Sequence, residues 1–229
     1  MIVGGFQKFS LIDYPGKVCA VIFTRGCNLR CKYCHNPELV VPDRYSEEIP
    51  FSDIYSFLET RVGKLDAVVF TGGEPTEQAD LLEVIANVAD MGFLIKLDTN
   101  GTNPDVLEEL FRNKLIDYIA MDIKAPIDDC FKVTGVDLDS EILKRSIELI
   151  VNSRVDHEFR TTVARGLIDK EDIIAMAETL KNARKYCLQR ALPSKSIDPD
   201  FLEVEPYSEE ELTYLISRID TDLANIEIR

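Results

Sequence analysis

Residues 18–34 read VCAVIFTRGCNLRCKYC, an apolar run that leads directly into Cys27, Cys31 and Cys34. The run from Val18 to Thr24 is short and rich in β-branched residues, which predicts a buried strand. Three thiols within eight residues indicate metal or redox chemistry in an intracellular protein rather than a disulfide scaffold. We therefore expect a strand whose carboxyl end carries a metal or redox site.

The rest of the chain repeats this pattern, with short apolar runs alternating with longer segments of helical period. Such alternation predicts β-α units built around parallel strands, which is an α/β fold. The expected strands span Val18 to Thr24, Leu65 to Thr71, Phe93 to Thr99, Tyr118 to Lys124, Glu158 to Ala164 and Tyr186 to Leu192. The expected helices span Phe51 to Val62, Glu77 to Met91, Asp105 to Asn113, Asp139 to Val151, Lys170 to Ala183 and, after these, Pro206 to Ile219, followed by a β-prone tail from Asn225 to Arg229. Because no linker-like stretch interrupts the pattern, we expect one domain over residues 1–229.

Composition excludes several classes of protein. The chain has 229 residues, of which 45% are hydrophobic, as in an ordinary globular protein. Its net charge of -15, from 41 acidic and 26 basic residues, argues against a nucleic-acid partner. The sequence has no signal-peptide pattern and no long apolar run, so we expect a cytoplasmic protein without a membrane partner. The scattered Cys19, Cys130 and Cys187 are expected to be structural thiols.

Polar residues follow several of the expected strands. Ligands of parallel β-α folds gather at the carboxyl ends of the strands, so these residues are candidates for binding. A glycine pair lets the backbone approach a ligand closely, and Glu74 can accept a hydrogen bond from an ammonium group. The same residues also suit a strand-to-helix turn and an Asn-Gly turn. The candidates are Gly72, Gly73, Glu74, Asp98, Thr99, Asn100, Asp122 and Lys124.

The three clustered cysteines are compatible with more than one kind of centre. Three thiolates would leave one iron of a [4Fe-4S] cluster open to another ligand. Zinc would need His35 as a fourth ligand, although zinc motifs usually place their ligands in two spaced pairs. Cys31 to His35 also matches the haem-attachment pattern C-x-x-C-H, and Cys31 with Cys34 matches a redox dithiol, but neither assignment gives Cys27 a role. Spacing alone leaves the cluster and zinc as competitors.

The cysteine spacing C-x-x-x-C-x-x-C, with Tyr33 before the last cysteine, resembles the signature of the radical S-adenosylmethionine (SAM) superfamily. The longer stretch GCNLRCKYCHNPE, residues 26–38, is similar to the cluster loop of glycyl-radical-enzyme activases, the proteins that activate anaerobic ribonucleotide reductase and pyruvate formate-lyase. The resemblance extends over nearly the whole chain. It implies a partial (β/α)6 barrel, one [4Fe-4S] cluster on Cys27, Cys31 and Cys34, and S-adenosylmethionine bound to the open iron.

The resemblance also implies roles for other residues. Gly72, Gly73 and Glu74, with Pro75, match the G-G-E-P motif that contacts S-adenosylmethionine. Asp98, Thr99 and Asn100 match a strand-end motif near the ribose, Asp122 and Lys124 match a D-x-K pair, and Arg160 matches the basic residue that pairs with the methionyl carboxylate. An internal ion pair of Arg160 with Glu158 or Asp122 is the alternative interpretation. The family's late strand-end histidine has no match near Gln189 and Arg190.

The leading functional hypothesis is therefore an anaerobic oxidoreductase that cleaves S-adenosylmethionine reductively to a 5'-deoxyadenosyl radical and installs a glycyl radical on a partner enzyme. Flavodoxin or ferredoxin would donate the electron. A radical enzyme that acts on a small molecule or nucleotide shares the same cofactor residues and is the second hypothesis. A zinc-binding interaction protein is the third.

Overall fold

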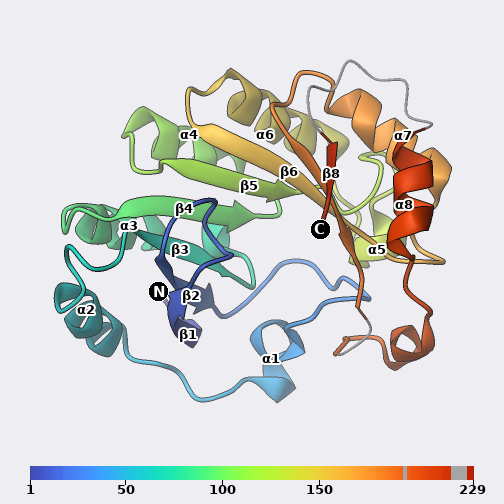
Figure 1. Ribbon diagram of the computed structural model, residues 1–229. Coiled ribbons are helices and arrows are strands. Elements are labelled where there is room, and N and C mark those ends of the chain that lie inside the picture. Colours follow the sequence, from blue (N-terminus) through green and yellow to red (C-terminus); the bar gives the residue numbers. More distant parts are fainter. Residues whose placement is uncertain (193–194, 218–225) are drawn as a thin grey trace. The chain divides into compact units, whose positions relative to one another are not determined.

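The computed structural model describes residues 1–192, 195–217 and 226–229 (Figure 1). The chain divides into two compact units. The first unit contains Met1–Asn28, Glu38–Thr99 and Asp105–Ile119, and the second contains Leu29–Pro37, Asn100–Pro104 and Ala120–Arg229. The cysteine loop therefore starts in the first unit with Cys27 and continues in the second with Cys31 and Cys34.

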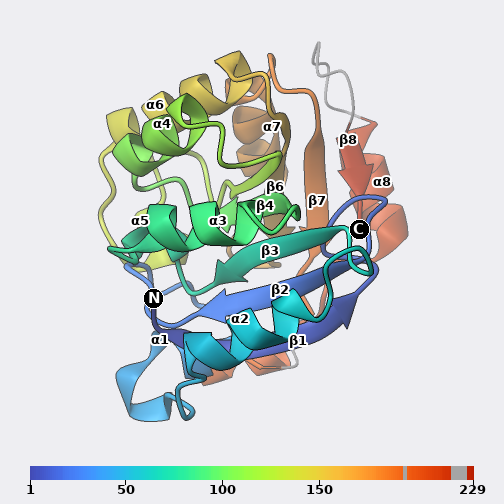
Figure 2. The same cartoon turned by 90° about the vertical axis from the view of Figure 1, so that its left-hand side faces the viewer.

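The first unit is built on four strands, of which Figure 2 shows β1, β2 and β3 side by side. Strand β1 runs antiparallel to β2, whereas β2, β3 and β4 are parallel to one another. The strands are β1 (Val3–Ser10), β2 (Cys19–Thr24), β3 (Ala67–Gly72) and β4 (Leu94–Thr99). The helices are α1 (Pro37–Val40), η1 (Pro42–Arg44), α2 (Phe51–Glu59), η2 (Pro75–Glu77), α3 (Leu81–Ala89) and α4 (Pro104–Arg112).

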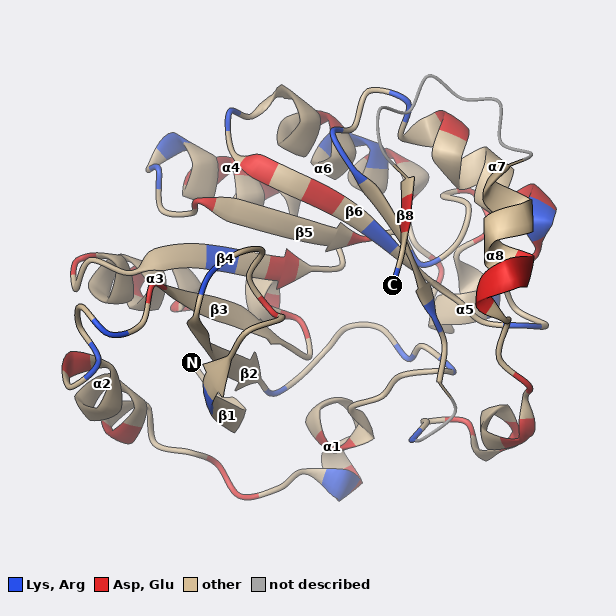
Figure 3. Cartoon of the chain, viewed as in Figure 1, with Lys and Arg blue, Asp and Glu red and all other residues tan. Residues whose placement is uncertain are grey.

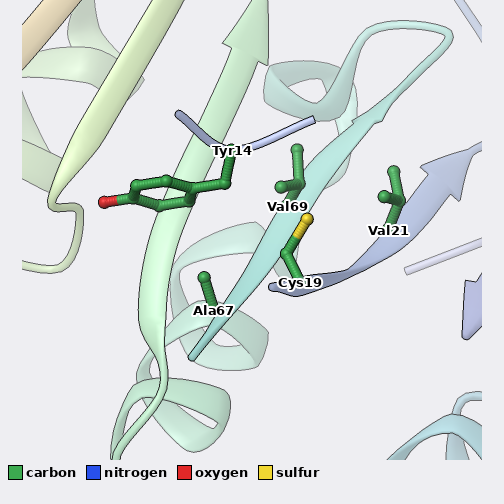
Figure 4. Packing of buried hydrophobic residues seen from close by; sticks show 5 residues of the cluster. All are labelled: Tyr14, Cys19, Val21, Ala67 and Val69. Atoms are coloured by element: carbon green, nitrogen blue, oxygen red, sulfur yellow. The ribbon is translucent and has the colours of Figure 1, made fainter. Parts of the chain in front are cut away.

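A small apolar cluster sets the register of the first strands (Figure 4). Cys19 lies opposite Ala67 and Val21 lies opposite Val69 in the parallel ladder, and Tyr14 belongs to the same buried cluster. Alternate residues of a strand point to the same face, so these side chains share one side of the sheet. The same register places Thr24 opposite Gly72, and the carboxyl ends of β2 and β3 therefore coincide.

The second unit continues the β-α pattern. Strand β5 (Tyr118–Asp122) passes from the first unit into the second, and β6 (Asp156–Val163), β7 (Tyr186–Arg190) and β8 (Ile226–Ile228) are parallel neighbours. The helices are α5 (Phe131–Thr134), α6 (Ser140–Asn152), α7 (Lys170–Thr179), η3 (Pro199–Glu203) and α8 (Glu209–Ile216). Strand β6 carries the acidic Asp156 and Glu158 followed by the basic Arg160, and α8 begins with three glutamates, as Figure 3 shows.

The six strands and five connecting helices predicted from the sequence are present, with ends that shift by a few residues. The predicted helix from Glu77 begins only at Leu81, because Pro75–Glu77 forms a 3-10 turn. Strand β1 was not predicted, since its sequence VGGFQKFS lacks an apolar run. Helix α8 lies within the predicted Pro206 to Ile219, but Ile219 and Asn225 lie outside the described residues. Among the described helices, none has the length and apolar character needed to cross a membrane.

Candidate active site

The carboxyl ends of β2 and β3 are joined by backbone hydrogen bonds in the first unit. The Gly73 amide donates to the Thr24 carbonyl at 2.9 Å, and the Glu74 amide donates to the Gly26 carbonyl at 2.8 Å. The Gly26 amide in turn donates to the Leu39 carbonyl at 2.8 Å. The residue immediately before Cys27 is therefore held on both of its backbone polar groups.

The glycine pair is required by this close approach. A Cβ on Gly73 would lie 1.9 Å from the Gly26 carbonyl oxygen, and a Cβ on Gly72 would lie 2.4 Å from the Thr24 amide nitrogen. Gly72 also has a φ of +115°, which side chains disfavour. Within this unit, the glycines let β3 approach the start of the cysteine loop, and their approach to a ligand stays a prediction.

Glu74 is almost fully buried, at 1% exposure. Its Oε1 accepts hydrogen bonds from the Thr76 amide at 3.1 Å, the Thr76 hydroxyl at 2.6 Å and the Thr99 hydroxyl at 2.7 Å. The carboxylate therefore caps the 3-10 turn η2, as the turn interpretation expected, and joins β3 to β4. Because three donors hold one oxygen, the orientation of the carboxylate is fixed.

Asp98 has a cationic neighbour that sequence reasoning missed. Lys96 is 3% exposed, and its Nζ lies 2.8 Å from an Asp98 carboxylate oxygen and donates to the Asp13 carbonyl at 2.6 Å. The ammonium group also lies 5.9 Å from the centre of the Tyr118 ring. A lysine two residues before Asp98 on an apolar strand shares its face, and this spacing was the signal available in the sequence.

The second unit holds the rest of the cysteine loop. The Cys34 amide donates to the Cys31 carbonyl at 3.0 Å, which closes a tight turn. Cys31 and Tyr33 are buried, whereas Cys27 and Cys34 are half-buried. Burial raises the pKa of the Cys31 thiol to about 11, against the opposing effect of Lys124. Burial likewise raises the pKa of the Tyr33 hydroxyl further above its usual value, so both groups are neutral in the metal-free protein.

Asp122, Lys124 and Arg160 form an ion-pair network between the carboxyl end of β5 and the middle of β6. An Asp122 carboxylate oxygen accepts from Arg160 Nε at 2.7 Å, and the other accepts from Lys124 Nζ at 2.9 Å. Burial alone would raise the pKa of Asp122, but the two cations outweigh it and hold that pKa well below its usual range. The internal ion pair expected as the alternative for Arg160 is therefore present, with Asp122 as its partner.

Asn100 lies on the same small cavity as Asp122 and Lys124, together with Leu29 and Cys130. Its side-chain oxygen accepts from the amide and hydroxyl of Thr102, at 3.0 and 2.7 Å. The Asn-Gly turn expected from the sequence is thus formed by a side-chain cap. Glu158, the other candidate partner of Arg160, is buried and accepts a bidentate pair from Arg229 at 3.0 and 2.8 Å.

The donor set suits an iron-sulfur cluster. All six cysteines of the chain are free thiols, and three of them lie in the loop that begins at Cys27. The described residues contain no group of three His, Cys, Asp or Glu side chains gathered around a point for one metal ion. A [4Fe-4S] cluster does not require side chains that converge on one point, because each cysteine binds a different iron of the cluster. The three thiols in the loop that follows Gly26 therefore fit a [4Fe-4S] cluster.

Comparison with known proteins identifies the class. Residues 21–187 match the Radical SAM superfamily. A Methanocaldococcus jannaschii protein provisionally named a glycyl-radical enzyme activating enzyme is 39% identical over 236 aligned residues, which cover 100% of this chain and 95% of the relative. Pyruvate formate-lyase-activating enzyme of Clostridium pasteurianum is 28% identical, with 96% and 92% covered. The crystal structure of Streptococcus suis SuiB bound to S-adenosylmethionine superposes with a TM-score of 0.66 at 16% identity, covering 91% of this chain and 49% of that one.

The chain belongs to the radical SAM superfamily. It is an enzyme of the radical SAM oxidoreductase type, and its cofactors are a [4Fe-4S] cluster and S-adenosylmethionine. The α/β fold of this superfamily, expected from the sequence, is confirmed by the structural neighbours. Its relatives include activating enzymes of glycyl-radical enzymes.

Proposed function

We propose that this chain activates a glycyl-radical enzyme of the anaerobic ribonucleotide reductase or pyruvate formate-lyase type. The observation that carries the proposal is the match, at 39% identity, to a relative named as an activating enzyme, over 100% of this chain and 95% of that one. A second activating enzyme also aligns over more than nine-tenths of each chain. The substrate would therefore be a protein backbone rather than a free small molecule.

Cys27, Cys31 and Cys34 would hold the cluster. When bound there, the cluster and S-adenosylmethionine would supply the radical chemistry that removes a hydrogen atom from a glycine of the partner. Gly72 and Gly73 keep the start of the loop against the end of β3. Tyr33, which precedes Cys34, is buried and its ring packs against Phe201.

The remaining polar residues would hold S-adenosylmethionine. The fixed carboxylate of Glu74 suits its ammonium group, with Thr99 setting the carboxylate orientation. Arg160 suits its carboxylate, because Asp122 holds Nε and thereby orients the planar guanidinium group. Asp98, oriented by the buried Lys96, suits the ribose hydroxyls, and Asn100 and Lys124 lie on the same cavity as Asp122.

We also propose that these residues act in one domain, in the cytoplasm, with flavodoxin or ferredoxin as the electron donor. Reductive cleavage of a sulfonium requires one low-potential electron for each event, which these small carriers supply. The net charge of -15 supports a partner other than nucleic acid.

The experiment that tests the activase function combines the reduced, reconstituted enzyme and S-adenosylmethionine with candidate glycyl-radical enzymes under anaerobic conditions. Electron paramagnetic resonance is expected to show a glycyl radical on one partner, and Cys31→Ser is expected to abolish it. Formation of 5'-deoxyadenosine without a glycyl radical on any partner would contradict the activase proposal and favour a small-molecule substrate.

A further inference from the structure

The cysteine loop of the second unit is held on one edge by α5. The Arg30 amide donates to the Thr134 carbonyl at 2.8 Å, and the Lys32 amide donates to the Val133 carbonyl at 3.2 Å. These two bonds fix the backbone on both sides of Cys31.

Residues far along the chain hold the opposite edge of the loop. The carbonyl oxygen of Lys32 accepts hydrogen bonds from the Ser196 hydroxyl and from the Asp198 amide, the latter at 3.2 Å. Ser196 is buried, and the Asp198 side chain caps η3 by accepting from the Asp200 amide at 3.1 Å. The peptide between Cys31 and Cys34 is thus bonded on two sides.

An aromatic contact completes this arrangement. The rings of Tyr33 and Phe201 are 6.1 Å apart at a tilt of 53°, and both residues are at most 5% exposed. Phe201 lies on η3, whereas its neighbour Leu202 is 43% exposed. One face of η3 is therefore buried against the residue that precedes Cys34, and the other face is exposed.

We propose that residues 196–204 form a clamp on the cluster loop, with Ser196 and Phe201 as positioning residues that slow loss of the cluster. Residues 21–187 match the superfamily, so this clamp lies outside the matched region and is supplied by a later part of the chain. Two bonds on the Lys32 carbonyl hold the Cys31–Cys34 turn, and the Phe201 ring excludes water and oxidants from Tyr33. The clamp would preserve the open-iron cluster when S-adenosylmethionine is absent.

The inference rests on the proposed cluster ligands and not on the choice of partner protein. The test uses the reconstituted full-length protein and follows the visible absorbance of the cluster after an iron chelator is added. Each variant is measured anaerobically and again after exposure to air. The measured quantity is the rate of cluster loss, which needs no glycyl-radical partner.

Ser196→Ala removes one hydroxyl with little change in volume, and we expect cluster loss about fivefold faster. Ser196→Thr keeps the hydroxyl and is expected to restore the rate. Phe201→Ala is expected to accelerate loss on the order of a hundredfold. Leu202→Ala, on the exposed face of the same short helix, is the matched control and should leave the rate unchanged.

Wild-type rates in both Ser196→Ala and Phe201→Ala would overturn the clamp, even if the wild-type protein binds iron and cleaves S-adenosylmethionine. Equal acceleration by Leu202→Ala would also overturn it, because the effect would then be a general loss of stability. By contrast, a full cluster in a protein that lacks Cys31 would refute the proposed ligand set rather than the clamp. Amide hydrogen exchange of residues 31–34 in the metal-free variants gives a second readout, and faster exchange in Ser196→Ala supports the proposal.

Discussion

Substitution of Gly73 by alanine would separate the two strand ends that hold the start of the cysteine loop. The new Cβ would lie 1.9 Å from the Gly26 carbonyl oxygen and 2.7 Å from its carbonyl carbon, whereas real Cβ contacts remain above 3.0 Å. Relief requires a movement of about 1 Å between two backbone segments. No flexible side chain is available to yield, because both contacting atoms belong to the backbone.

The cost has two contributions. Overpacking of this kind lowers the free energy of unfolding by about 1 to 3 kcal/mol. The movement also breaks the bond from the Glu74 amide to the Gly26 carbonyl, which contributes about 1 kcal/mol. We therefore expect Gly73→Ala to lower the free energy of unfolding by about 2 to 4 kcal/mol. Because Cys27 follows Gly26, iron retention should fall as well.

Urea unfolding of the metal-free protein, followed by circular dichroism, measures the first effect, and iron content after reconstitution measures the second. Gly5→Ala is the matched control, since its Cβ would meet Phe23 at an ordinary 3.4 Å. That control should change the free energy of unfolding by less than about 1 kcal/mol. Equal stability and equal iron content of the two variants would refute the close-approach explanation of the glycine pair.

Three further outcomes are expected. Asp122→Asn should lower the free energy of unfolding by about 2 to 4 kcal/mol near neutral pH. The pKa of Asp122 is depressed in the folded state. The stability that Asp122 contributes is therefore complete above the ordinary pKa of 3.8 and is lost as the pH falls below that value. Urea midpoints measured between about pH 6 and pH 2 should therefore converge for the two proteins, and a constant difference would contradict the ion-pair network. In the metal-free protein, mass spectrometry after alkylation should find Cys27 and Cys34 modified before the four buried cysteines, and cluster assembly should protect them; uniform labelling would contradict the described burial. Arg229→Ala should lower the free energy of unfolding by about 1 to 2 kcal/mol in the same urea assay, because the substitution removes a bidentate partner of the buried Glu158. The effect is moderate because the Arg229 side chain is 37% exposed. A change within error would show that this pair contributes no net stability.

Most of the parallel strands could be predicted, because each is a short apolar run bounded by turn residues. Strand β1 could not, since it is an edge strand whose exposed residues Gln7, Lys8 and Phe9 give it no apolar pattern. Its place is set by pairing with β2. The pairing depends on partners elsewhere in the chain rather than on the local sequence.

The cofactors of the candidate site could be predicted from the family resemblance, since spacing alone left zinc as a competitor, but the contacts that support the site could not be predicted. The glycine pair was found by sequence, and the structure adds a contact with Thr24 and Gly26 that the sequence did not predict. Lys96 carried a readable signal in its spacing from Asp98. The contact of Phe201 with Tyr33 carried none, because no local pattern links residues so far apart in the chain.

The hydrogen bond from Ser196 to the Lys32 carbonyl joins residues 164 positions apart. During synthesis, a ribosome that adds about 5 to 20 residues per second needs about 10 to 30 s to make that stretch. During this time the three cysteines have been made, whereas the segment that later covers their loop does not yet exist. Metal-free thiols can then be oxidised or can bind a metal other than iron. The order of synthesis therefore favours cluster insertion after residues 196–204 have been made.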